Sequence, residues 1–319
     1  MSKKLWTIAK GLVAVAILTV LFAALDWRDA LQRLSNVSLS WLAVAIALNI
    51  SAFLLSAWRW QRLAAVLTSP PRYSQAVQFY WIGKFFSTIL PSNIGGDVVR
   101  AAMARRFGST TVMLSSIAVE RVTGFLVVVT IAVVTLSTMP DLRELIPFGW
   151  ALPVVLIVSM WIVGSRVVTS DRLKEIVEKA KNGGGLRSKI VSKLQVMISG
   201  VMAYRHERGA LVFTTLLSVV FYALLFAFQG SLIWAVDGEV TVAALVSAAP
   251  VVILVSALPI TINGLGVAEA AFVAVYVLVG VDAEAALAAA VLRRLIITAS
   301  ALPGAWFWMT VRTKEADPR

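Results

Sequence analysis

Residues 241–280 read TVAALVSAAPVVILVSALPITINGLGVAEAAFVAVYVLVG. This stretch carries one charged residue, Glu269, and is interrupted in its middle by LPITINGLG (258–266). Proline and glycine end helices and leave backbone groups without intrahelical partners. At membrane depth such a break is tolerated only inside protein or against a water-filled cavity. We therefore predict two membrane-embedded helical legs joined by a break.

A second apolar segment, residues 75–90, is followed by a similar break, PSNIGG (91–96). Its flanks are basic, whereas the flanks of the 241–280 segment are acidic. Because Lys and Arg collect on the cytoplasmic side of a membrane, we predict re-entrant hairpins that enter from opposite faces. The flanking charges are Arg59, Arg62, Arg72, Arg105 and Arg106 for the first hairpin, and Asp237, Glu239, Asp282 and Glu284 for the second.

The composition places these hairpins in a multi-pass membrane protein. Of 319 residues, 59% are hydrophobic and 14% are charged, whereas soluble domains average about 45–50% apolar and about 25% charged. This excludes a soluble globular protein, a disordered chain and a soluble nucleic-acid binder, and the continuous apolar runs exclude a β-barrel. We predict an all-α polytopic membrane protein, a single domain of residues 1–319. Its six full transmembrane helices lie at Gly11–Leu25, Trp41–Trp58, Thr111–Met139, Gly149–Val168, Ala210–Val236 and Ala285–Val311.

Six spans place both termini in the cytoplasm, together with a basic loop at 169–208. Residues 166–208 hold ten Lys and Arg against four acidic residues, so we interpret the net charge of +12 as a topology signal that also faces anionic lipid. Within this loop Leu186–Tyr204 is amphipathic, and it either lies on the inner leaflet or is a solvated connector.

The chain has no Cys and one His, which excludes disulfides, thiolate nucleophiles and a His-rich metal site.

The order of these elements is span, span, hairpin, span, and then the same again with the opposite orientation. Residues 1–139 and 149–312 would form the two halves of an inverted-topology repeat, which is common in transporters. The hairpin residues give a second indication, because Gly95 and Arg100 are five apart, as are Gly264 and Glu269.

Charged side chains within hydrocarbon cost at least about 2.5–3.5 kcal/mol each, so each of them needs a reason. They are either paired for structural reasons, such as Asp97 with Arg100 and Glu269 with Arg293 or Arg294, or they line a substrate pathway, and the two roles are compatible. The candidate substrate-binding residues are Lys84, Asp97, Arg100, Glu120, Arg121, Asn263, Glu269, Arg293 and Arg294. The predicted hairpin tips contain Pro91, Asn93, Gly95, Gly96, Pro259, Thr261, Gly264 and Gly266. Arg59, at the end of the second span, is interpreted as a topology anchor, with contact to a lipid headgroup as a second role that stays open.

Three stretches, LPSNIGGDVVR (90–100), VER (119–121) and LPITINGLGVAE (258–269), resemble the lysylphosphatidylglycerol synthase transmembrane family. This family includes the flippase-like domain at the N-terminus of MprF-type proteins. The resemblance implies a lipid-translocating membrane domain with the hairpins and their charges at its centre. The residues that carry it are Pro91, Gly95, Arg100, Glu120, Arg121, Pro259, Asn263, Gly264, Gly266 and Glu269.

MprF-type synthases carry a soluble aminoacyl-transferase domain after the membrane region. The sequence ends at Arg319, so we expect a stand-alone membrane domain that does not itself aminoacylate lipids, and we assign no catalytic residue. We expect a multi-pass protein of the bacterial inner (plasma) membrane that translocates a phospholipid or lipid-linked headgroup in a polar groove between the hairpins. Its partners would be membrane lipids, anionic or aminoacylated, with no nucleic acid; a homo-oligomer stays open.

No nucleotide-binding loop is present, and we expect no cofactor and no metal. Glu120 and Glu269 are then the candidate proton carriers if transport uses a proton gradient. The sequence leaves two alternative functions open: an intramembrane enzyme of lipid or lipid-linked glycan metabolism, and an accessory subunit of cell-envelope synthesis. The enzyme would need a nucleophile or a metal site, for which Asp97, Glu120 and Glu269 are the available carboxylates.

Overall fold

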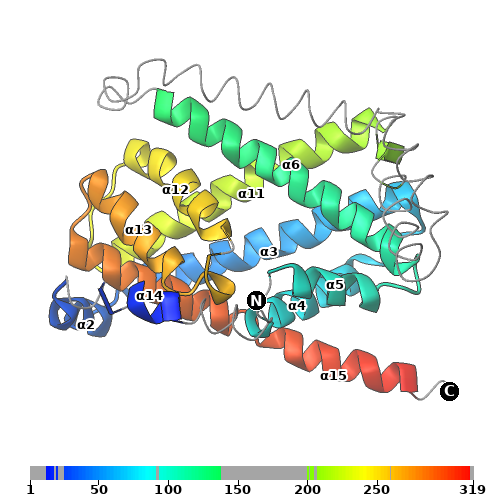
Figure 1. Cartoon of the computed structure of the whole chain (residues 1–319), viewed down its shortest axis with the longest axis horizontal. Helices are drawn as coiled ribbons and strands as arrows, with labels where there is room; N and C mark the ends of the chain where they lie inside the picture. Colours follow the sequence, from blue (N-terminus) through cyan, green and yellow to red (C-terminus); the bar gives the residue numbers. More distant parts are fainter. Residues whose placement is uncertain are drawn as a thin grey trace. The chain divides into compact units, whose positions relative to one another are not determined.

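A computed structural model describes residues 12–17, 19–20, 25–90, 93–137, 200, 202–204, 207–258 and 260–316. Over these residues the protein is helical, and they contain no strand (Figure 1). The predicted span Gly149–Val168, nearly all of the basic loop 169–208, and the hairpin prolines Pro91 and Pro259 lie outside the described residues.

Several helices begin and end near the boundaries that the apolar runs predict. The helix of the second predicted span, however, continues to Leu67, and the last predicted span, Ala285–Val311, is divided into two helices between Ala299 and Pro303. The described helices are α2 (Trp27–Ser35), α3 (Leu39–Leu67), α4 (Tyr73–Ile89), α5 (Asn93–Met103), α6 (Thr110–Ser137), α11 (Arg208–Ala235), α12 (Val242–Ala257), the 3₁₀ turn η2 (Ile262–Gly264), α13 (Val267–Leu278), α14 (Ala283–Ala299) and α15 (Pro303–Ala316).

Four segments of the described chain are long and apolar enough to cross a membrane. They are Leu39–Leu67, Thr110–Thr135, Arg208–Ala235 and Ala283–Val311, the last of which comprises α14 and most of α15. These correspond to four of the six predicted spans and make the protein a multi-pass membrane protein. The first predicted span is helical at residues 12–17 and 19–20, and the count of six spans stays a prediction.

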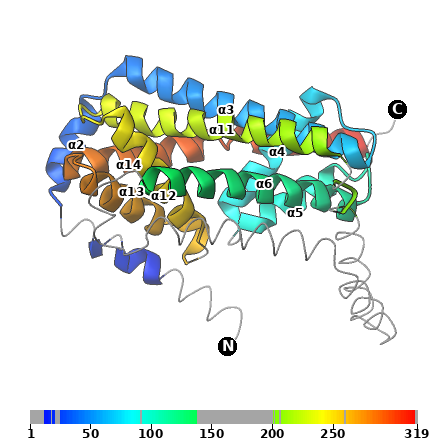
Figure 2. The same ribbon diagram turned by 90° about the horizontal axis from the view of Figure 1, so that it is seen from above.

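The chain divides into two compact units. Unit 1 is Met1–Leu55, Tyr80–Gly96 and Val220–Arg319, and unit 2 is Ser56–Phe79 and Asp97–Val219. Each unit therefore combines segments from both predicted repeat halves. The helices α3, α4, α5 and α11, which are labelled in Figure 2, contribute residues to both units. The inverted repeat itself stays a prediction.

The first predicted hairpin is a helix, a break and a second helix. The break falls between the end of α4 at Ile89 and the start of α5 at Asn93. A Cβ atom on Gly96 would overlap the Ser87 hydroxyl and the backbone oxygen of Gly83. The start of α5 therefore lies directly on α4, at a distance that only glycine allows.

The second predicted hairpin has the same plan within unit 1. Thr241 caps α12 by accepting a hydrogen bond from the Ala244 amide at 3.2 Å, and α12 ends at Leu258, which is extended. After the break α13 packs against both α12 and α14, and α14 packs against α2 (Figure 1). Since α12 and α13 contact each other on either side of the break, they form a helical hairpin.

Left-handed backbone builds the break between α12 and α13. Asn263, Gly264 and Gly266 have φ values of 52°, 66° and 81°, a region that residues other than glycine and asparagine rarely adopt. At Gly266 an added Cβ would also lie 2.9 Å from the backbone oxygen of Ala14. The helical segment at 12–17 thus packs on the hairpin tip.

Candidate functional site

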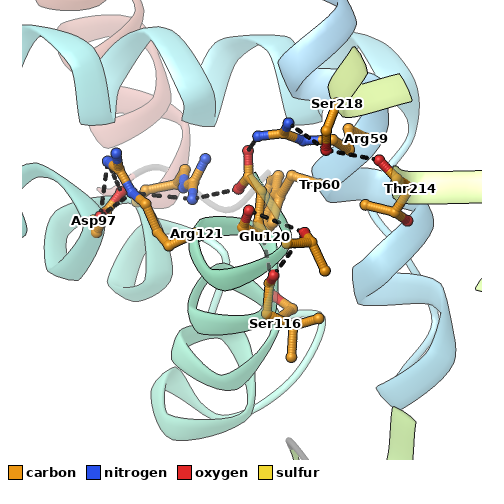
Figure 3. Close-up of polar contacts among 11 residues, drawn as sticks. Arg59, Trp60, Asp97, Ser116, Glu120, Arg121, Thr214 and Ser218 are labelled. Carbon is orange, nitrogen blue, oxygen red and sulfur yellow. Dashed lines mark hydrogen bonds and ion pairs between the residues drawn. The ribbon is translucent and has the colours of Figure 1, made fainter. Parts of the chain in front are cut away.

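Unit 2 contains a buried ion-pair network of Arg59, Asp97, Arg100, Glu120 and Arg121, which we call the arginine network (Figure 3). At its centre each oxygen of the Glu120 carboxylate binds one arginine. Nη2 of Arg59 donates to Oε1 at 3.2 Å, and Nη2 of Arg100 donates to Oε2 at 2.9 Å. Arg59, Arg100 and Glu120 are 5%, 3% and 2% exposed, so this bridge joins α3, α5 and α6 away from solvent.

The network extends from this bridge toward the surface through Asp97. Nη2 of Arg100 lies 3.5 Å from Oδ1 of Asp97. Arg121 also binds Asp97, with Nε donating to Oδ2 at 3.1 Å and Nη2 donating to Oδ1 at 3.2 Å. The Arg121 side chain is 64% exposed. A line of alternating charges therefore runs from a buried carboxylate to an exposed guanidinium.

Polar and aromatic side chains position the two buried guanidiniums. Arg59 donates from Nη1 to the Ser218 hydroxyl at 2.9 Å, and Ser218 donates in turn to the Thr214 carbonyl at 2.8 Å. Cζ of Arg100 lies 5.0 Å from the ring centre of Trp60, a cation–π distance. Nε1 of Trp60 donates to the Ser116 hydroxyl at 3.0 Å, which fixes the ring (Figure 3).

Helix geometry explains why this set converges. Asp97 and Arg100 are three residues apart on α5, which places them on the same helix face. Glu120 and Arg121 are consecutive on α6, so their directions differ by about 100°. Glu120 consequently points into the unit, while Arg121 faces outward and reaches back to Asp97.

The interpretation of Arg59 as a topology anchor at the end of a span is wrong. Helix α3 continues to Leu67, which places Arg59 within the helix, buried and paired with Glu120. The signal was present in the sequence, because the apolar residues Leu63, Ala64 and Leu67 continue the helical spacing beyond Arg59. The apolar run ends at Trp58, but the helix does not.

Unit 1 contains a second cluster at the hairpin break, which we call the hairpin lock: Asn263, Gly264, Gly266, Glu269 and Arg294. Nε of Arg294 donates to Oε1 of Glu269 at 2.5 Å. Its Nη1 and Nη2 atoms donate to the backbone oxygens of Asn263 and Gly264 at 3.3 and 3.2 Å. The other carboxylate oxygen of Glu269 accepts from the Gly266 amide at 2.7 Å. The lock therefore satisfies backbone groups that the broken helix leaves exposed.

Arg293 lies beside the lock but has a different environment. Its Cζ atom is 5.9 Å from the ring centre of Phe272. Phe272 and Tyr276 are fully buried with their ring centres 4.5 Å apart, and the Tyr276 hydroxyl donates to Oε1 of Gln229 at 3.2 Å. This aromatic and amide group adjoins the lock on α13 and α11.

The candidate residues thus fall into two sets, each held within one unit. Asp97, Arg100, Glu120 and Arg121 meet in unit 2, and the pairing of Asp97 with Arg100 is present. In unit 1 Glu269 pairs with Arg294 rather than with Arg293. Four other candidates lie in helices or in the breaks between them. Lys84 is in α4 and Asn93 is at the start of α5. The backbone of Gly95 lies close to the Leu90 side chain, and Thr261 is buried in the second break.

Within the described part of the chain, no group of three or more His, Cys, Asp or Glu side chains could hold a metal ion. The two clusters instead combine guanidiniums with carboxylates, and in the hairpin lock Arg294 also binds two backbone oxygens. Guanidiniums bind carboxylates and phosphates through paired hydrogen bonds. The clusters can therefore bind or exchange an anionic group.

Apolar helices, two hairpins and charges buried between helices define a membrane domain. The family model described as "Lysylphosphatidylglycerol synthase TM region" matches residues 7–304. The chain therefore belongs to the lysylphosphatidylglycerol synthase transmembrane family, and its membrane function is related to lipids. No curated protein and no solved structure matches the chain.

Proposed function

We propose that the protein is a flippase-like lipid transporter, which moves a phospholipid or a lipid-linked headgroup between the leaflets of the bacterial inner membrane. The Glu120 bridge is the observation that carries this proposal. Two arginines on different helices converge on one carboxylate. The helices of Arg59 and Glu120, α3 and α6, are long and apolar enough to cross a membrane. Charges at this depth are rare and are typically functional.

The chemistry of the bridge suits a phosphate headgroup. A phosphodiester presents two anionic oxygens, and these match guanidinium donors as a carboxylate does. Glu120 then acts as an internal counterion that the phosphate replaces at Arg59 or Arg100. Protonation of Glu120 would weaken its hold on the same arginines, which offers one route for coupling to a proton gradient.

In unit 1 the hairpin lock supports the same function. A hairpin whose backbone is open in the membrane is typical of sites where transporters bind charged groups. Glu269 and Arg294 hold this break in one conformation. We infer that the lock keeps the hairpin open toward the polar headgroup while the acyl chains stay in the bilayer. The lipid class that fits is an anionic or aminoacylated phospholipid.

A transport assay tests the proposal directly. The purified full-length protein is reconstituted into phosphatidylcholine vesicles that contain a trace of fluorescent phosphatidylglycerol, and dithionite bleaches the outer leaflet. Transport exposes inner-leaflet lipid to the bleach, so the protected fraction falls below that of protein-free vesicles. An unchanged protected fraction for anionic, zwitterionic and aminoacylated probes, with folded protein, contradicts the proposal. Mass spectra of the same vesicles reveal any chemical turnover, which would favour the intramembrane enzyme instead.

The proposal includes an orientation with cytoplasmic termini and two re-entrant hairpins. A reporter fused after Arg106 should then lie in the cytoplasm, and one fused after Gly280 should lie outside. If the break near residue 90 instead links two full spans, the two reporters exchange or share sides. That result would overturn the inverted repeat, and the transport proposal would then be tested by the vesicle assay alone.

A further inference from the structure

Two consecutive arginines on α14, Arg293 and Arg294, have different surroundings. Arg294 donates to one carboxylate oxygen and two backbone oxygens. Arg293 is half-buried, and within the described part of the chain it makes no hydrogen bond or ion pair. Since consecutive residues differ by about 100° in direction on a helix, one arginine faces the hairpin break while the other points elsewhere.

The neighbouring acceptors are already occupied by other donors. Both carboxylate oxygens of Glu269 have partners, the Gly266 amide and Arg294. The Gln229 amide oxygen accepts from the Tyr276 hydroxyl, and Phe272 offers only its ring face. Glu269 attracts Arg293 electrostatically but forms no hydrogen bond with it, so the donors of Arg293 have no direct partner in the described chain.

An arginine in this position is suited to a ligand. A guanidinium has five N–H donors in a planar fork, and leaving them unmet in apolar surroundings is costly. Glu269, Arg293 and Arg294 together carry two positive charges and one negative charge. A ligand with one negative charge therefore neutralises the cluster and meets the donors of Arg293.

We propose that Arg293 is a second binding position for the phosphate oxygens of the transported lipid, besides Arg59 and Arg100, whereas Arg294 is a positioning residue that holds the hairpin break. This inference rests on the proposed transport function and assigns separate roles to the two arginines. The ligand class is a singly charged phosphate group, which either a lipid headgroup or free inorganic phosphate supplies. Phe272 lies against the guanidinium, with the Cζ atom of Arg293 5.9 Å from its ring centre.

The test compares lipid affinity with thermal stability in purified full-length variants. Native mass spectrometry measures binding of dimyristoyl phosphatidylglycerol, with dimyristoylglycerol as the probe that lacks phosphate, and inorganic phosphate is added as a competitor. We expect Arg293→Gln to weaken phosphatidylglycerol binding about tenfold, the effect of one charge-assisted hydrogen bond, with an unchanged melting temperature. Arg293→Lys should retain part of the affinity. Arg294→Gln should lower the melting temperature.

Arg28→Gln is the matched control, because Arg28 also lies over an aromatic ring, Trp27 at 5.6 Å, but is exposed. It should change neither measurement. Competition by inorganic phosphate at equal concentration would identify free phosphate as the ligand, whereas its failure to compete identifies the lipid. Unchanged affinity in Arg293→Gln, or a fall in melting temperature equal to that of Arg294→Gln, overturns the inference.

The vesicle assay separates this inference from the proposed function. If wild-type protein moves no lipid but Arg293→Gln still loses phosphatidylglycerol binding, the transport proposal fails and the binding site stands. If wild-type protein moves lipid and Arg293→Gln binds and moves it equally well, the transport proposal stands and the role of Arg293 is wrong.

Discussion

Glu120 in unit 2 and Glu269 in unit 1 are both buried carboxylates, and in each of them both oxygens accept a hydrogen bond. The two carboxylates differ in the groups that they hold together. Glu120 binds two arginine side chains from two other helices. Glu269 binds one arginine and a backbone amide three residues before it. The first carboxylate joins elements that are distant in sequence, whereas the second holds a local turn. The same residue type therefore serves tertiary packing in one unit and backbone conformation in the other.

The largest expected effect concerns transport, because the proposal needs the arginine network to exchange the headgroup and the hairpin lock to hold the break. Arg100→Gln or Glu269→Gln should abolish lipid translocation while the protein still inserts into the membrane. The vesicle assay measures this below the melting transition of each variant, and the expression level in the membrane serves as the control. The double variant is decisive. If Arg100→Gln combined with Glu269→Gln expresses well and moves lipid at the wild-type rate, the charges are scaffolding and the pathway assignment is wrong.

The comparison of the two carboxylates predicts unequal losses of stability. In Glu120→Gln the amide nitrogen replaces one acceptor and opposes a guanidinium donor, so a buried charge loses its partner at a cost of about 3–5 kcal/mol. In Glu269→Gln the guanidinium of Arg294 keeps two backbone oxygens, and we expect about 1–3 kcal/mol. Thermal melting followed by tryptophan fluorescence checks the order. Equal losses would mean that the lock carries as much tertiary packing as the bridge.

A comparison of two glycines, Gly266 in the hairpin break and Gly280 after α13, tests how the hairpin tip is packed. Gly266 and Gly280 both have positive φ, 81° and 91°, so alanine is strained at either position by about 1–3 kcal/mol. An added Cβ at Gly266 also meets the Ala14 backbone oxygen at 2.9 Å, whereas Gly280 has open space around it. Gly266→Ala should therefore lower the melting temperature more than its matched control Gly280→Ala. The reverse order would contradict the packing of residues 12–17 on the hairpin.

The smallest effect is expected at the exposed end of the arginine network. Arg121 binds Asp97 through two nitrogens, but its side chain is 64% exposed, and exposed ion pairs contribute about 0–1 kcal/mol. Arg121→Gln should consequently leave the melting temperature nearly unchanged, whereas Arg100→Gln, at a buried position on the same carboxylate, should lower it clearly. A large loss in Arg121→Gln would show that the outer pair is as important as the bridge.

Hydropathy and helix-breaking residues predicted most of the architecture. Long apolar runs predict helices regardless of their neighbours, because in a bilayer each backbone group must find its partner within the helix. Three of the predicted spans end within a few residues of the observed segments, whereas the second, predicted at Trp41–Trp58, extends to Leu67. The interruption after residue 90 and the one at 258–266 also follow from proline and glycine alone.

The partners of the charges were harder to predict. Sequence spacing finds pairs on one helix, such as Asp97 with Arg100, because residues three apart share a face. It does not find Arg59 with Glu120, which are 61 residues apart, because their contact depends on how α3 packs against α6. For the same reason Arg59 was interpreted as an anchor.

The sequence by itself determined that the protein is a helical membrane protein with two broken apolar segments and an unusual set of buried charges. These properties depend on residue type and local spacing, which hydrocarbon and the helical backbone constrain directly. Only the tertiary structure decided which charge meets which. On α14 the choice of Arg294 over Arg293 for Glu269 depends on a rotation of about 100° between adjacent side chains. That offset is the same in every α-helix, so the choice is made by the packing of α13 on α14, which determines which side of α14 faces the hairpin break.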